Sequence, residues 1–253
     1  MSPGQQLLDQ PEPQAHFVQL YGADEPALAK NVGRYLREGL KRGDGLLVIA
    51  TSAHAKLLYQ EINGLGVFVD AEETLARIMV RGQPEWGFFE EIVGGAMTQV
   101  QTAAGLRAYG EMVGILWNGG QYAAAIQLEK FWNRLLKSNP FNLFCGYSID
   151  VFSDEFQIAA LDALLCAHTH LVPAGRNGDL ESAIDRSMED ILGRRAAGLR
   201  PLMQSHIQPS HALLPRAESS ILWLRNNLPE EADQILARAR QYYQVSKARA
   251  AAR

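Results

Sequence analysis

Up to Ser148, short apolar runs alternate along the chain with segments whose apolar residues recur at helical spacing. The runs lie at residues 16–21, 46–50, 67–70, 106–112 and 141–147. The run at residues 46–50 is unbroken, which is typical of a strand that is covered on both faces. Helical spacing is found at about residues 24–42, 52–65, 71–79, 86–104 and 124–138. The alternation predicts an α/β fold with a mainly parallel sheet and helices on both faces.

After Ser148 the pattern becomes helical throughout. One helix is expected from Phe152 to Val172, and a linker from Pro173 to Gly178. Further helices are expected at about 180–192, 194–207, 216–227 and 230–246. We therefore predict a sheet domain at residues 15–172 and an all-helical extension at 179–246, with residues 1–14 and 247–253 flexible. The extension could cover the sheet domain, or it could form the surface for a partner or a homodimer.

Composition and charge exclude several classes of protein. The 253 residues are 47% hydrophobic and 21% charged, which is the normal mix for a chain that buries a core. The net charge of −4 argues against a general nucleic-acid binder. The first residues lack the features of a secretory signal, and no apolar run approaches the ~20 residues that span a bilayer. We expect a cytoplasmic protein, without membrane or direct nucleic-acid contact, in which Cys145 and Cys166 are reduced, buried thiols.

Polar residues follow several of the predicted strands. Because the carboxyl ends of parallel strands meet at one edge of a sheet, we expect these side chains to converge there on a ligand. The predicted ligand-binding residues are Thr51, Ser52 and His54 after the second strand, Asp70 after the third, and Glu111 and Ser148 after the later two. The alternative is that each one merely caps the helix that follows, as Ser52 and Asp70 are well suited to do.

Glu111 differs from the others because its neighbours, from Tyr109 to Trp117, are mostly apolar. A carboxylate in such surroundings is costly unless it is paired or hydrogen bonded. It could contact a ligand, or it could pair structurally with Arg107 or with a backbone amide.

The sequence shows no catalytic or metal-binding motif. It contains no G-x-x-x-x-G-K-[ST] loop, GxGxxG, CxxC, H-E-x-x-H or G-x-S-x-G elbow. His16 opens a strand, where a structural hydrogen bond is expected. His168 and His170 are two apart on a predicted helix, so they do not share a face and make a poor metal pair. We therefore predict no catalytic residues, no metal site, no cofactor and no enzymatic activity.

Four blocks of the sequence stand in a recognisable order and spacing. They read HFVQLYGADEPALAKNVGRYLREGLKRGDGLLVIATSAH, DAEETLARIMVRGQP, RAYGEMVGILWNGGQYAAAIQLEKFWNRLL and FNLFCGYSIDVF. Together they resemble the MEDS family, the methanogen/methylotroph, DcmR sensory domain, over about residues 15–170. The resemblance implies a RecA/KaiC-like sheet whose phosphate loop has degenerated. It also implies a domain that senses small molecules in the company of histidine kinase or DNA-binding modules, with no catalytic set.

The favoured hypothesis is a ligand-sensing regulatory protein that binds a small organic molecule at the strand-end cleft. Its expected partner is a histidine kinase or a transcription regulator. Two alternatives stay open. One is a divergent nucleotide-binding, ATPase-like protein in which Asp70 and Glu111 hold Mg²⁺. The other is a scaffold or interaction protein that acts through its C-terminal helices.

Overall fold

The computed structural model describes residues 3–22, 24–154, 156, 158–173, 177–205 and 214–251. The chain divides into two compact units. The α/β unit comprises Met1–Ser148 and Cys166–Val172, and the helical unit comprises Ile149–Leu165 and Pro173–Arg253. Residues 149–165, which the sequence placed with the sheet, group with the helices.

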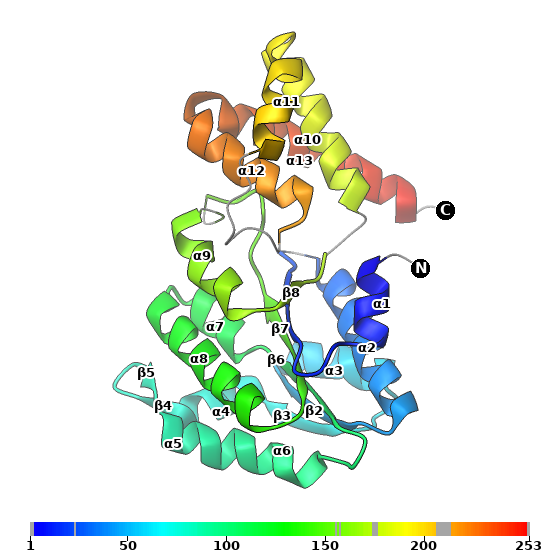
Figure 1. Cartoon of the computed structure of the whole chain (residues 1–253), viewed down its shortest axis with the longest axis vertical. Coiled ribbons are helices and arrows are strands. Elements are labelled where there is room, and N and C mark those ends of the chain that lie inside the picture. Colours follow the sequence, from blue (N-terminus) through cyan, green and yellow to red (C-terminus); the bar gives the residue numbers. More distant parts are fainter. Residues whose placement is uncertain are drawn as a thin grey trace. The chain divides into compact units, whose positions relative to one another are not determined.

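One six-stranded parallel sheet forms the centre of the α/β unit (Figure 1). Its strand order is β3-β2-β6-β7-β1-β8. The strands are β1 (His16–Leu20), β2 (Gly45–Ala50), β3 (Val67–Asp70), β6 (Leu106–Gly110), β7 (Asn142–Tyr147) and β8 (His170–Leu171). Strands β1, β2 and β6 are buried along their whole length, as expected for strands that are covered on both faces. The predicted α/β fold with a parallel sheet is confirmed.

Helices cover both faces of this sheet (Figure 1). One face carries α1 (Pro3–Asp9), α2 (Glu25–Arg42) and α3 (Ser52–Glu61). The other carries α4 (Ala71–Ile78), α5 (Trp86–Phe89), the π-helical turn η1 (Glu90–Gly94), α6 (Gly95–Val100), α7 (Met112–Asn118) and α8 (Tyr122–Ser138). An antiparallel hairpin of β4 (Met79–Val80) and β5 (Gln83–Pro84) joins α4 to α5.

Close packing of α7 against β7 sets the position of the residues that follow β6. A Cβ atom at Gly114 of α7 would lie 2.5 Å from the carbonyl oxygen of Gly146 in β7, so only glycine allows this approach. The helix that begins after Glu111 therefore lies directly on the sheet.

Two stretches adopt a different structure from the predicted one. The strand expected at 106–112 ends at Gly110, and α7 begins at Met112. The helix expected from Phe152 to Val172 is shorter, because α9 (Ile158–Ala167) ends before β8. Strand β8 pairs with the edge of β1, and the Thr169 N–H donates to the His16 carbonyl at 2.8 Å. The available edge of β1, which local sequence does not reveal, overrides the helical pattern.

Helix α1 is held in place by side-chain contacts, although residues 1–14 were expected to be flexible. Leu8 in α1 is buried, and the buried Arg107 side chain donates to the carbonyls of Leu8 (2.9 Å) and Asp9 (3.1 Å). The Asp9 carboxylate in turn pairs with Arg34 at 2.6 Å. Contacts with residues distant in the sequence, Arg107 and Arg34, therefore hold α1 in place, and the local sequence of α1 does not reveal them.

The helical unit contains α10 (Asn177–Leu192), α11 (Arg195–Ser205), α12 (Arg216–Asn227) and α13 (Pro229–Ala251). Buried apolar residues from these helices form its core: Ile184, Met188, Ile221, Ile235 and Ala239. Residues 206–207 of a predicted helix, 174–176 of the predicted linker and 252–253 lie outside the described residues. Helix α13 includes residues 247–251, which were expected to be flexible. Among the described helices, none is both long and apolar enough to cross a membrane.

Arg107 provides a test of the fold. Besides the two α1 carbonyls, it donates to the Tyr35 carbonyl (2.7 Å) and to Asp44 (3.0 Å), and it is 1% exposed. R107Q leaves these buried acceptors without their donor, so we expect the free energy of unfolding to fall by about 3–5 kcal/mol in urea denaturation. The control R195Q removes an exposed pair with Glu231 and should cost less than about 1 kcal/mol. A loss in R107Q as small as that in the control would contradict this account.

Candidate functional site

The carboxyl ends of β2 and β6 form the topological switch point of the sheet. These strands are neighbours, but their connections leave in opposite directions. Strand β2 continues through α3 to β3, whereas β6 continues through α7 and α8 to β7. Open α/β sheets bind ligands in the crevice that such a divergence creates.

Glu111 lies at this crevice and connects its two sides. Its side chain does not cap α7, which starts at the next residue. Instead, Oε2 accepts from the Thr51 backbone N–H at 2.7 Å, and Oε1 accepts from the Tyr109 hydroxyl at 2.6 Å. His54 Nδ1 pairs with Oε1 as well. We call Thr51, His54, Tyr109 and Glu111 the switch-point network. Of the two structural partners considered for Glu111, the backbone amide is the one observed.

The network determines the protonation of its members. The hydrogen bond to Glu111 raises the pKa of His54, against the opposing effect of burial. Burial, followed by the charge of Glu111, raises the pKa of Tyr109 well above its ordinary value. The same two causes raise the pKa of Tyr21, whose ring meets His54 edge-on at 5.8 Å, to about 12. Both tyrosines therefore stay protonated near neutral pH.

The remaining predicted site residues have local roles. Asp70 caps α4 by accepting from the Glu73 N–H at 2.9 Å. Ser52 Oγ lies 3.4 Å from Asp70 Oδ2, and Ser148 Oγ donates to the Gly22 carbonyl at 3.0 Å. The structure thus brings Thr51 and His54 onto Glu111, while Ser52, Asp70 and Ser148 make other contacts.

Space beside Glu111 is small. The crevice here has no room for a water molecule and is lined by Leu28, Ala29, His54, Leu57, Leu58 and Tyr109. Both oxygens of Glu111 have donors, and Asp70 is used as a cap, so this arrangement gives no support to a magnesium site. A ligand could enter only if the elements around the crevice moved apart.

A second group of polar side chains lies inside the α/β unit, on the sheet face covered by α8. We call it the buried cluster: His16 from β1, Cys145 from β7, Glu129 from α8, and His168 from the segment before β8. Each has less than a tenth of its surface exposed, and their potential metal-ligating atoms all lie within 4.8 Å of one another.

Burial and the neighbouring His168 lower the pKa of His16 to about 3. Burial and the charge of Glu129 raise the pKa of Cys145 well above its ordinary value. The cluster contains residue types that bind metals.

Sequence reasoning missed this cluster because its members are far apart in the chain. His16 was expected to make only a structural hydrogen bond. His168 was considered as a metal ligand only in a pair with His170. The available signal was Glu129, which falls on the buried face of α8 between Leu128 and Phe131 and is itself fully buried. The prediction that both cysteines are buried is correct for Cys145 and wrong for Cys166, which is exposed.

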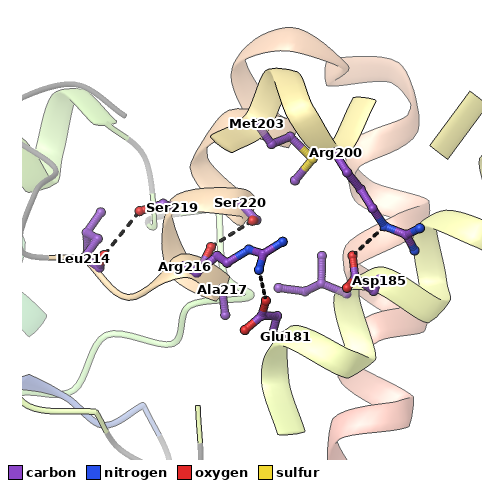
Figure 2. A pocket seen from close by; sticks show the side chains of 10 residues that line it. Glu181, Asp185, Arg200, Met203, Leu214, Arg216, Ala217, Ser219 and Ser220 are labelled. Atoms are coloured by element: carbon purple, nitrogen blue, oxygen red, sulfur yellow. Dashed lines mark hydrogen bonds and ion pairs between the residues drawn. The ribbon is translucent and has the colours of Figure 1, made fainter. Parts of the chain in front are cut away.

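The helical unit holds a larger hollow (Figure 2). This helical pocket has a volume of about 320 Å³ and lies between α10, α11 and α12. Two ion pairs border it, Arg216–Glu181 at 2.8 Å and Arg200–Asp185 at 3.1 Å, and Met203 adds apolar surface. Its size is at the lower end of small-molecule pockets.

The family model for MEDS, the methanogen/methylotroph, DcmR sensory domain, matches residues 15–169. The matched residues include the switch-point network and the buried cluster, and they end before the four C-terminal helices. Searches among curated proteins and among solved structures returned no match.

E111Q tests the switch-point network. The folded-state pKa of His54 is raised above its unfolded value of about 6.5. The stability gained from the charged pair is therefore fully present below about pH 6.5 and is lost as the pH rises through the folded-state pKa. We expect E111Q to lower the free energy of unfolding by about 1.5–3 kcal/mol at about pH 6 and by less at about pH 9.

Urea denaturation at both pH values measures this difference, and NMR titration of the histidines should show a lower pKa for His54 in the variant. The matched control is E38Q, which removes an exposed pair with Lys41 and should change stability by less than about 0.5 kcal/mol at either pH. A loss in E111Q that does not vary with pH would mean that His54 and Glu111 do not form a charged pair.

Proposed function

The chain belongs to the MEDS family of sensory domains, and we propose that it is a regulatory protein that senses a small organic molecule without catalysing a reaction. One observation carries the choice of site. A carboxylate that is only 4% exposed is held at the switch point by groups from both neighbouring strands. Open α/β sheets usually bind ligands at this edge, and a buried carboxylate there is a suitable anchor for a polar group of a ligand.

Access to this anchor depends on α3. Of the ten residues of α3, His54 and Leu58 are buried, whereas Tyr59 is 57% exposed. Helix α2 on the same face buries six of its residues. An element with few buried contacts opens at a low free-energy cost. We propose that the ligand replaces His54 beside Glu111 and that α3 shifts, since a sensor needs two states with different ligand affinity.

The signal would leave through the helical unit, to a histidine kinase, to a transcription regulator or to a second copy of the chain. Tyr242 and Tyr243 of α13 have partners within the unit, because Arg186 stacks on Tyr242 at 4.1 Å and Tyr243 meets the Phe152 ring at 6.1 Å. Leu202 and Val245 are about half exposed and are more suitable as contact residues.

The helical pocket is a second candidate for the ligand site, and its larger volume supports it. The helical pocket has about 320 Å³, whereas the crevice beside Glu111 has no room for water. A ligand in the helical pocket would bind outside the matched family region and leave the sheet as a scaffold.

Thermal denaturation with a panel of small organic molecules separates these proposals. We expect at least one compound to stabilise the wild-type chain, by about 2.7 kcal/mol at a hundred times its dissociation constant. E111Q should lose this stabilisation, because the anchor is changed. S220F, which fills the helical pocket from α12, should keep it.

If S220F lost the stabilisation by the compound and E111Q kept it, the ligand site would be the helical pocket and not the crevice beside Glu111. Failure of every compound to stabilise the wild-type chain would contradict ligand sensing. Circular dichroism of each variant without ligand confirms that it is folded.

A further inference from the structure

The buried cluster has the composition of a metal centre, and its potential ligating atoms all lie within 4.8 Å of one another. We propose that His16, Glu129, Cys145 and His168 bind one divalent transition metal ion, Zn²⁺ by preference, in a closed tetrahedral site. This site is separate from the switch-point network, and its presence does not depend on the sensory function.

The hydrogen bonds around His16 show which of its nitrogens is available. Asn133 Nδ2 donates to the Ala167 carbonyl at 2.9 Å, so Asn133 Oδ1 is the atom that faces His16 Nδ1 at 3.2 Å. An amide oxygen only accepts, and therefore Nδ1 carries the proton. The Nε2 lone pair of His16 then points into the cluster. Metal-binding histidines ordinarily donate their other ring N–H to an oxygen in this way.

Two acceptors face each other inside the cluster. His16 Nε2 lies 3.4 Å from Glu129 Oε2, and this oxygen has no hydrogen-bond donor among the described residues although Glu129 is fully buried. The Tyr147 hydroxyl donates to the other oxygen, Oε1, and orients the carboxylate. A lone pair and a carboxylate oxygen repel each other in an apolar interior unless a cation, or a proton donated by a neighbour such as the Cys145 thiol, lies between them.

The shortest distances in the cluster correspond to those of metal coordination, and the whole set of ligating atoms lies within 4.8 Å, so the outermost side chains would move closer around an ion. Charge-assisted N–H···O bonds are about 2.7–2.9 Å long. The two contacts between an imidazole nitrogen and a carboxylate oxygen, His16–Glu129 and His168–Glu129, are instead 3.4 Å long. The His16–Cys145 contact is also 3.4 Å, which is an ordinary length for a hydrogen bond to sulfur. A tetrahedral zinc ion with nitrogen and oxygen ligands at about 2.1 Å separates them by about 3.4 Å, and a thiolate by about 3.6 Å. A buried His168–Glu129 ion pair without a metal would be expected to close to a shorter distance.

The charges of the cluster also suit a divalent ion. On binding, Cys145 Sγ loses its proton to solvent and becomes a thiolate. Thiolate and carboxylate then balance the two positive charges, and the two neutral imidazoles complete four ligands with no net charge left in the interior. Thiolate and imidazole ligands select zinc over magnesium or calcium. Four protein ligands with almost no exposure correspond to a structural site, which takes up its ion as the chain folds.

Metal analysis of the untagged full-length protein tests the proposal. Inductively coupled plasma mass spectrometry of the protein, refolded with Zn²⁺ and desalted, should find about one zinc ion per chain. C145S and H168N each remove one ligand and should retain less than about a tenth of that amount. The matched controls C166S and H170N change the other cysteine and a neighbouring histidine outside the cluster, and both should keep the metal.

Cobalt provides a readout that does not depend on variant stability. Wild-type protein refolded with Co²⁺ should show the intense visible bands of a tetrahedral ion and a thiolate charge-transfer band. E129Q, which keeps the thiolate, should retain the charge-transfer band if it binds cobalt, whereas C145S should lack it. A folded wild-type chain that takes up neither zinc nor cobalt would overturn the proposal. Equal metal content in C145S, H168N and the two controls would overturn it too.

Discussion

The cost of burying charge organises the α/β unit. Strand β6 lies in the middle of the sheet and has an ionic side chain at each end, Arg107 near its start and Glu111 just after its last residue. Neither can remain inside without partners. Arg107 is satisfied by carbonyls of α1 and α2 and by Asp44, and Glu111 by groups from the start of α3 and from β6 itself. The two charges therefore attach three helices of one face to the same strand.

The two buried glutamates of this unit are satisfied in different ways. Glu111 has a donor at each oxygen, from a backbone amide and a tyrosine hydroxyl, with His54 beside them. Glu129 accepts one hydrogen bond from Tyr147, and the nearest imidazole nitrogens lie 3.4 Å from its oxygens. The first is a complete network whose rearrangement requires a competitor such as a ligand. The second is the set of potential ligating atoms on which the proposed metal site is based. This contrast is the reason for assigning sensing to one and metal binding to the other.

The two proposed sites lie in regions that differ in how completely they are buried. The buried cluster joins β1, β7, α8 and the segment before β8, all within the core. A metal ion there would hold these elements together and leave the sheet rigid. The switch-point network depends on α3, which has few buried residues and borders the edge strand β3. A sheet with one helix of few buried residues at its switch point suits the proposed sensing role, because the binding energy of a ligand would then move that helix.

The sequence by itself determined the parallel α/β fold, the helices of the extension and the family, because these follow from local periodicity and from blocks of contiguous residues. It also identified Glu111, Thr51 and His54 as neighbours, since residues that follow parallel strands must meet at one edge. Tertiary structure alone decided that β8 forms on the free edge of β1, that α1 is held by Arg107, and that Asp70 is only a cap. It also decided that His16, Glu129, Cys145 and His168 come together. Those contacts join residues that are far apart in the chain. Their distances are set by how the elements pack, which the spacing of residues along the sequence does not reveal.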